Sequence, residues 1–205
     1  MAITLILKTR LRIKDMTELS EYKEQLPEVI KNLSNAALHF DLLSTKVENP
    51  VTLNIKNTPM ISRERSTKGS TFVLYNYARI CAILQQFQDK VAMEYYDPLP
   101  SVLETSFSPL IQEEEWNLMF DYILEWPNVL NKCQHLSSLR FHYICGFLSS
   151  LSLCFSRFYR KYRILTEPLP QLLPLMTARL HLLLGLRQVY QNAFNLLSIH
   201  PPTHM

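Results

Sequence analysis

A chain of 205 residues that is 47% hydrophobic can bury a core, and its net charge of +3 is too small to identify a partner. Only three glycines occur, which disfavours glycine-rich phosphate loops and tight-turned β-folds. The charge is unevenly spread. Residues 1–80 hold 12 Lys and Arg against 8 Asp and Glu, residues 81–135 hold 2 against 9, and residues 136–205 hold 7 against 1. Two basic ends around an acidic middle suggest an electropositive face suited to a polyanion, with ordinary surface scatter as the alternative.

Cysteine usage and the N-terminus indicate the compartment. The four cysteines have spacings that fit neither a zinc site nor a secreted disulfide framework, and most lie among apolar residues. We therefore expect small core side chains in a reducing, cytoplasmic setting. The N-terminal apolar run precedes its basic residues, which is the reverse of a signal peptide, and no run approaches the length of a membrane span. The abrupt start leads us to expect a fragment of a longer protein.

The first 69 residues predict an N-terminal extension of α/β-like character. Alternation of apolar residues over 7–13 fits a short strand or an entry segment, and a helical pattern begins near Thr17. Pro27 fits the first turn of a second helix, whose apolar face runs through Val29 to Leu43. Residues 51–55 alternate as in a strand. A polar, basic loop follows, and we expect residues 58–69 to contact phosphates.

Residues 70–205 predict one all-α helical bundle. The first helix begins at Ser70, a plausible N-cap, and prolines punctuate the linker that follows it. A second helix carries Trp116 and stops near Pro127. Residues 137–165 predict a long helix and residues 175–198 the last one. Each has an apolar stripe at helical spacing, which is typical of bundle packing.

No constellation of residues predicts catalysis. The six histidines lack metal-ligand spacing with one another or with cysteine. Glu113, Glu114 and Glu115 fall in a helical first turn, where the helix dipole stabilises negative charge. Neither a nucleophile elbow nor a phosphate-binding loop occurs, and no motif typical of S-adenosylmethionine binding is found. We therefore expect no catalytic residues, no cofactor and no metal.

Residues 155–163 interleave aromatic side chains with four cations, Arg157, Arg160, Lys161 and Arg163. Arginine and lysine neutralise phosphates, and aromatic faces stack on unpaired bases. The alternative is an amphipathic helix end, with aromatic residues in the core and cations favoured by the helix C-terminus. The pattern alone leaves both interpretations open.

Three separate motifs, in order, resemble the DALR anticodon-binding domain of arginyl-tRNA synthetases. Residues 72–80 resemble the opening of that domain, and residues 158–165 resemble its Phe-Tyr and Val-Leu segment. Residues 177–205 resemble its last helix and tail. The name motif falls on residues 184–187, where only the final Leu-Arg is kept. The resemblance covers about two-thirds of the chain and implies an all-α bundle of the DALR anticodon-binding type.

The resemblance also implies which residues contact the anticodon loop. By matched position these are Phe72, Tyr75, Tyr159 and Met205, while Tyr77 stands where the family has histidine. Arg79, in the first motif, fits either a phosphate contact or a salt bridge at the edge of the core. Together with the basic run, the expected tRNA-binding residues are Phe72, Tyr75, Arg79, Arg157, Tyr159, Arg160, Lys161, Arg163 and Met205.

Neither class I synthetase signature, His-Ile-Gly-His or Lys-Met-Ser-Lys, occurs in this chain. Residues 66–79 are similar to family members that lack the synthetase centre. That resemblance implies a non-catalytic subunit that presents arginine tRNAs to a partner 3-methylcytidine tRNA methyltransferase, with no membrane partner. Two alternatives stay open. One is the anticodon-binding part of an arginyl-tRNA synthetase. The other is a helical protein-interaction module without RNA, whose acidic middle docks a basic partner.

Overall fold

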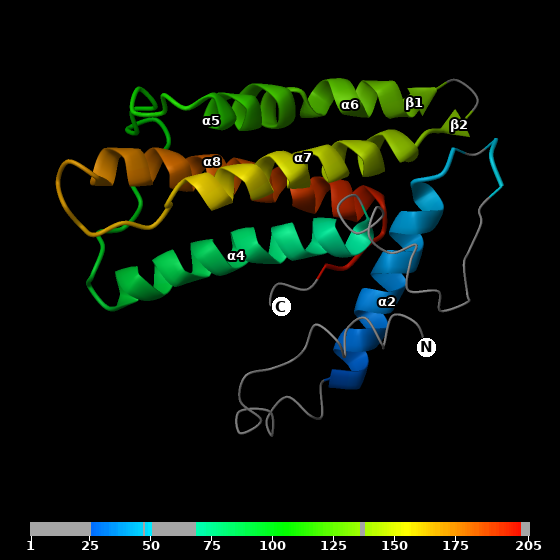
Figure 1. The fold of residues 1–205 in the computed structure, drawn as a ribbon, viewed down its shortest axis with the longest axis horizontal. Coiled ribbons are helices and arrows are strands. Elements are labelled where there is room, and N and C mark those ends of the chain that lie inside the picture. The colour runs from blue at the N-terminus through cyan, green and yellow to red at the C-terminus, as the bar shows by residue number, and fades with distance from the viewer. Residues whose placement is uncertain (1–25, 47, 51–68, 136–137, 202–205) are drawn as a thin grey trace.

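The computed structural model describes residues 26–46, 48–50, 69–135 and 138–201, and its long helices lie in three layers (Figure 1). One outer layer is α4, the middle layer is α7 with α8, and the other outer layer is α5, the π-helical segment η2 and α6. α2 crosses one end of the bundle and contacts α4 and α7. The bounds are α2 Leu26–Leu43, α4 Ser70–Ala92, α5 Glu113–Asn117, η2 Leu118–Leu124, α6 Trp126–Cys133, α7 His142–Lys161 and α8 Leu173–Leu196.

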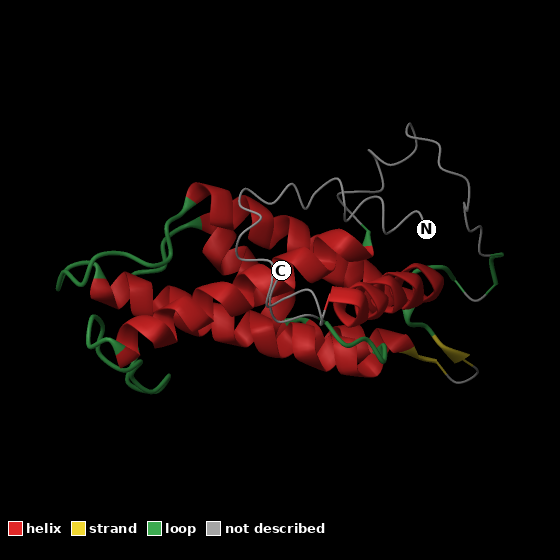
Figure 2. Cartoon of the chain, turned by 90° about the horizontal axis from the view of Figure 1, so that it is seen from below, coloured by secondary structure: helices red, strands yellow, loops and turns green. Residues whose placement is uncertain are grey.

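The expected all-α bundle is confirmed (Figure 2). In the described part of the chain, strand structure is confined to one hairpin, β1 Gln134–His135 and β2 Ser138–Leu139, paired antiparallel. The apolar stripes expected along the helices form one core. Its largest fully buried side chains come from α4, η2, α7 and α8 and from the loop before α5. They are Tyr190, Phe155, Phe158, Phe194, Ile80, Leu110, Leu118, Ile144, Leu148, Leu151, Leu180 and Leu182.

Four predicted boundaries differ from the structure. The last helix, α8, runs over Leu173–Leu196 and not over residues 175–198. Ser70 is the first residue of α4 and not its N-cap; Gly69 takes that place, without a side-chain capping bond. α7 begins at His142 and ends at Lys161, because Tyr162 is extended (φ −123°, ψ 133°). The element before Pro127, η2, ends at Leu124, near the expected stop. Pro127 itself lies in the first turn of α6, where a missing N–H costs nothing.

The turn from loop to α5 is fixed by a capping box. The Gln112 side chain accepts from the Glu115 backbone N–H, and Glu115 Oε2 accepts from the Gln112 N–H at 3.1 Å. Glu113, Glu114 and Glu115 occupy the first turn, as predicted. α5 then passes directly into η2, so these residues form one continuous helical rod against α7 and α8.

Gly185 of α8 lies close to Ile123 of η2. A Cβ at this position would lie 2.8 Å from Ile123 Cδ1, which is shorter than side chains tolerate. Gly185 stands where the name motif has alanine. An alanine methyl here would require the far end of the Ile123 side chain in η2 to shift.

The N-terminal predictions are tested only in part. The strand at 51–55, the basic loop to residue 68 and the helical pattern from Thr17 lie outside the described residues. Within α2, Ala36 and Phe40 are buried in the same core as α4 and α7. A boundary between an extension and a DALR-like domain at residue 70 stays a prediction.

Candidate nucleic-acid interface

Arg79 of α4 lies against two exposed tyrosine rings. Its Cζ is 4.4 Å from the centre of the Tyr75 ring and 4.5 Å from that of the Tyr159 ring. Its Nη2 donates to the Tyr75 hydroxyl at 2.6 Å. Tyr75 is 47% exposed and Tyr159 is 40% exposed. We call these three side chains the tyrosine–arginine stack. It joins two of the separate motifs that the sequence singled out.

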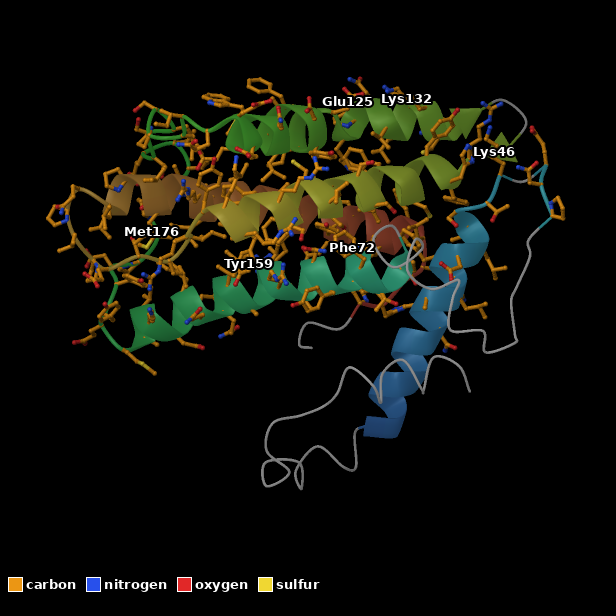
Figure 3. The ribbon with its side chains drawn as sticks, in the orientation of Figure 1. Lys46, Phe72, Glu125, Lys132, Tyr159 and Met176 are labelled. Atoms are coloured by element: carbon orange, nitrogen blue, oxygen red, sulfur yellow. The ribbon has the colours of Figure 1, made fainter. Side chains whose placement is uncertain are left out.

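Helical geometry explains how α4 and α7 present the stack. Tyr75 and Arg79 are four residues apart on one face of α4, while Leu74 and Ala78 turn into the core. On α7, Tyr159 follows the fully buried Phe158, so its ring emerges at the edge of the core. Figure 3 shows Tyr159 beside α4, where the two helices meet. A salt bridge was one of the two alternatives for Arg79, and none is found among the described residues; its guanidinium lies instead against the two tyrosine rings.

Phe72 lies one turn before Tyr75, towards the start of α4 (Figure 3). Its ring is half-buried, and its carbonyl accepts from Asn76 Nδ2 at 2.8 Å. Tyr77, which replaces the family's histidine, is only 3% exposed and packs edge-on against Phe194 at 5.3 Å. This departure from the family pattern therefore lies in the core and away from the stack.

The cations of 157–163 do not form one patch. Lys161 pairs with Glu114 of α5, and the Glu114 carboxylate raises the pKa of Lys161 while Lys161 lowers that of Glu114. The Tyr162 hydroxyl lies 3.0 Å from both Gln112 Oε1 and Glu114 Oε2 and donates to these acceptors. Lys161 therefore already has an acidic partner within the chain.

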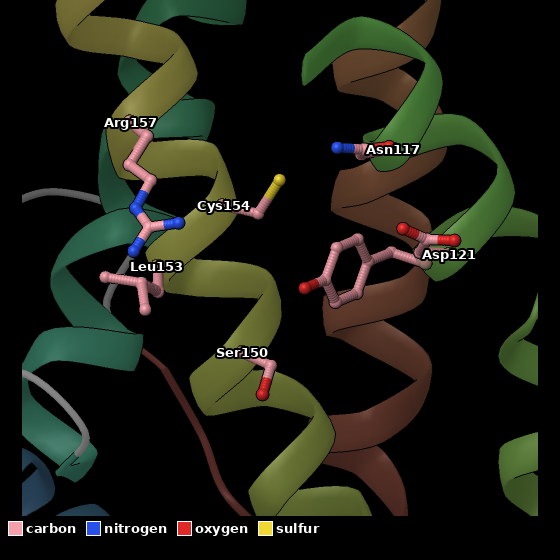
Figure 4. A pocket seen from close by; sticks show the side chains of 7 residues that line it. Asn117, Asp121, Ser150, Leu153, Cys154 and Arg157 are labelled. Carbon is pink, nitrogen blue, oxygen red and sulfur yellow. The ribbon is translucent and has the colours of Figure 1, made fainter. Parts of the chain in front are cut away.

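Arg157 lines a groove between α7 and η2 (Figure 4). This groove has a volume of about 290 Å³, and both of its walls contribute polar side chains. The lining residues are Asn117, Asp121, Tyr122, Ser150, Leu153, Cys154 and Arg157. Arg160 and Arg163 are exposed. Arg160 Nε donates to its own helix at Ser156 O (3.3 Å), and Arg163 follows the end of α7. Met205 lies outside the described residues.

The structure also contains a buried ion pair between α8 and α5, which the sequence did not predict. Arg179 Nε of α8 lies 2.7 Å from Glu115 Oε1 of α5, with side chains 8% and 0% exposed. Arg179 Nη1 also donates to Arg163 O at 2.8 Å, and its Cζ lies 5.3 Å from the Tyr162 ring centre. Arg179 of α8 thereby connects the start of α5 with the residues that follow the end of α7.

The described residues contain no group of three or more His, Cys, Asp and Glu that could hold a metal ion. The four cysteines are free. Burial raises the pKa of Cys145 to about 12 and of Cys154 to about 11, so both are neutral thiols at physiological pH. Among the described helices, none has the length and apolar character needed to cross a membrane.

Comparison with known proteins places this geometry in context. Residues 73–205 match the model of the DALR anticodon binding domain. The chain is 34% identical to DALR anticodon-binding domain-containing protein 3 of Danio rerio, over 94% of this chain and 37% of that protein. The rat protein of the same name is 32% identical, over 84% and 33%. The chain thus spans about a third of the length of these curated relatives.

More distant similarities point to arginyl-tRNA synthetases. Arginine--tRNA ligase of Sulfolobus acidocaldarius is 27% identical over 86% of this chain and 25% of that protein. A solved structure from Campylobacter jejuni, named as an arginyl t-RNA synthetase, superposes with a TM-score of 0.62 at 19% identity. It covers 87% of this chain and 35% of that chain. At that identity the similarity shows a shared fold.

Proposed function

Because the chain belongs to the DALR anticodon binding domain family, we propose that it is a non-catalytic subunit that binds the anticodon region of arginine tRNAs. It presents these tRNAs to a partner 3-methylcytidine tRNA methyltransferase. The arginine specificity is supported by the similarity to arginine--tRNA ligases. The methyl-transfer chemistry is assigned to the partner, since the sequence carries no motif typical of S-adenosylmethionine binding.

The observation that carries the RNA-binding proposal is the tyrosine–arginine stack. Two half-exposed rings are held by one guanidinium, so little side-chain freedom is lost when a base stacks on them. A base stacked on an aromatic side chain contributes about 1–3 kcal/mol. Anticodon-loop bases are unpaired and can splay onto such a surface. Phe72 extends the same helix face toward the start of α4.

The charges around the stack favour a polyanion. Arg160 follows Tyr159 directly and Arg163 follows the end of α7; both are exposed, and neither is in an ion pair with a described residue. Glu167 is the one acid in residues 136–205, which include both helices of the middle layer. In this proposal Arg160 and Arg163 contact phosphates, and Arg157 and Lys161 contribute once RNA competes with their acidic neighbours.

Two measurements test the proposal. Fluorescence anisotropy compares binding of an arginine tRNA with a tRNA of the same length whose anticodon loop is exchanged. We expect the arginine tRNA to bind more tightly. Methylation by a purified 3-methylcytidine tRNA methyltransferase is then followed with and without the chain. We expect methylation of the arginine tRNA only with both proteins. Equal affinity for both tRNAs, or methylation that ignores the chain, would contradict it.

A further inference from the structure

An apolar stripe lies on the outer surface of α5 and η2. Trp116, Phe120 and Leu124 are spaced four residues apart, so they share one face of the helical rod. They are 38%, 54% and 56% exposed. The Trp116 and Phe120 rings are stacked, with centres 5.6 Å apart and planes at 17°. We call these three side chains the tryptophan stripe.

The stripe lies on the opposite side of the bundle from the tyrosine–arginine stack. The stack is formed by α4 and α7, whereas the stripe belongs to the outer layer of α5, η2 and α6. Figure 3 shows Glu125 and Lys132 on this outer layer and Tyr159 beside α4. A ligand on the stripe would therefore leave the stack accessible.

The charge around the stripe selects against nucleic acid. Residues 113–133 hold five acidic side chains and one lysine. That lysine, Lys132, is paired with Glu125, and Glu114 and Glu115 also have ion-pair partners. Glu113 and Asp121 are exposed and lie in no ion pair with a described residue. Phosphates would be repelled here, while a basic segment would find unpaired carboxylates beside an apolar surface.

We propose that the tryptophan stripe is a docking surface for a basic amphipathic helix of a protein partner. A helix with apolar residues on one face covers Trp116, Phe120 and Leu124, and lysines or arginines at its edges meet Glu113 and Asp121. Contiguous exposed apolar residues rimmed by charge are typical of protein interaction sites. The proposal does not depend on RNA binding, so tRNA could remain on the stack while the partner binds.

Trp116 provides the readout. Of the two tryptophans, Trp126 is only 7% exposed, so covering Trp116 dominates any shift of the emission. The probe is an amphipathic helical peptide of leucine and lysine, and its control is the same peptide with glutamate in place of lysine. We expect the lysine peptide to bind and to shift the emission to shorter wavelength. Trp116→Phe should abolish the shift and retain most of the binding.

Substitution locates the site. Phe120→Ser with Leu124→Ser removes two apolar contacts without changing charge and should weaken peptide binding at least about tenfold. Val102→Ser with Leu103→Ser removes two exposed apolar side chains that lie before α5, outside the stripe, and should leave binding unchanged. Neither double variant should alter tRNA affinity, which separates this proposal from the proposed RNA role.

Four outcomes would overturn the proposal. They are no binding of the lysine peptide, equal binding of both peptides, and equal loss in the two double variants. The fourth is a shift of the Trp116 emission that is caused by RNA or by self-association of the chain. Titration with an oligonucleotide detects the first cause, and sedimentation detects the second.

Discussion

Arg179 and Glu115 form an ion pair in the core, with Nε and Oε1 2.7 Å apart and side chains 8% and 0% exposed. Glu115 Oε2 also closes the capping box of α5, and Arg179 Nη1 holds the carbonyl of Arg163. Both Glu115 oxygens and two of the three Arg179 nitrogens thus have hydrogen-bond partners, and such additional bonds help to offset the desolvation cost of a buried pair. The pair fixes the end of α7, next to Tyr159, relative to α5.

We predict that Arg179→Ala strongly destabilises the fold. It leaves the Glu115 carboxylate buried without its partner, which costs about 3–5 kcal/mol in the free energy of unfolding. Urea denaturation followed by circular dichroism measures this loss. Lys132→Ala is the control, since its pair with Glu125 is exposed and should matter little. Equal stability of the Arg179 and Lys132 variants would refute the structural role of the buried pair.

A double-mutant cycle tests the close approach at Gly185. Gly185→Ala gains helix propensity of about 1 kcal/mol but places its methyl 2.8 Å from Ile123 Cδ1. Ile123→Val removes that Cδ1 atom. We therefore predict that Gly185→Ala is more favourable by about 1 kcal/mol in the Ile123→Val background than in the wild type. Additive effects of the two substitutions on the free energy of unfolding would show that the Ile123 side chain does not clash with a methyl group at position 185.

Burial of Cys145 predicts a loss of stability at alkaline pH. Its pKa is raised to about 12 in the folded chain from an ordinary value near 9. Folding therefore disfavours the thiolate, and the stability that is fully present below about pH 9 falls as the pH rises toward about 12. Cys145→Ala should reduce this fall, measured as the unfolding free energy at several pH values. A pH dependence identical to that of the wild type would count against a buried thiol.

The fold was largely predictable from local pattern, but the pairings between distant residues were not. α4, α7 and α8 follow apolar spacing that the sequence displays. A break near Pro127 was predictable, whereas the start of α6 at Trp126 was not, because a proline can follow the end of one helix or lie in the first turn of the next. The Arg179–Glu115 pair joins residues 64 positions apart, and no local rule selects that partner. In the sequence, Glu115 is explained by its place in the first turn of a helix, and Arg179 lies within the last motif without a feature that points to a partner.

The candidate interface shows the same division. Tyr75, Arg79 and Tyr159 were each singled out by resemblance. The spacing within α4 could predict the contact of Tyr75 with Arg79, but only the packing of α4 on α7 adds Tyr159. The four cations of 157–163 looked like one patch. Helical geometry instead turns Arg157 toward the η2 groove and Lys161 toward Glu114.

Salt dependence of tRNA binding distinguishes the cations. Each phosphate contact contributes roughly −0.7 to −0.9 to the slope of log affinity against log salt concentration. Replacing Arg157, Arg160, Lys161 and Arg163 by alanine should flatten this slope by about 3 if all four make contact. Because Arg160 and Arg163 are exposed and unpaired with described acids, their double variant should give about half of that change. An unchanged slope in the quadruple variant would exclude these residues as phosphate contacts.

The most direct test of the account is the affinity of Tyr159→Ala for an arginine tRNA anticodon stem-loop, compared with Tyr143→Ala. Both tyrosines lie on α7 and both are 40% exposed, but only Tyr159 contacts Arg79. The account predicts that Tyr159→Ala weakens binding by about 1–3 kcal/mol with an unchanged salt slope and melting temperature. Tyr143→Ala should bind as the wild type does. Equal affinities of the two variants would contradict the stack as an RNA-binding surface. So would a loss of affinity in Tyr159→Ala that is accounted for by a lower melting temperature of that variant.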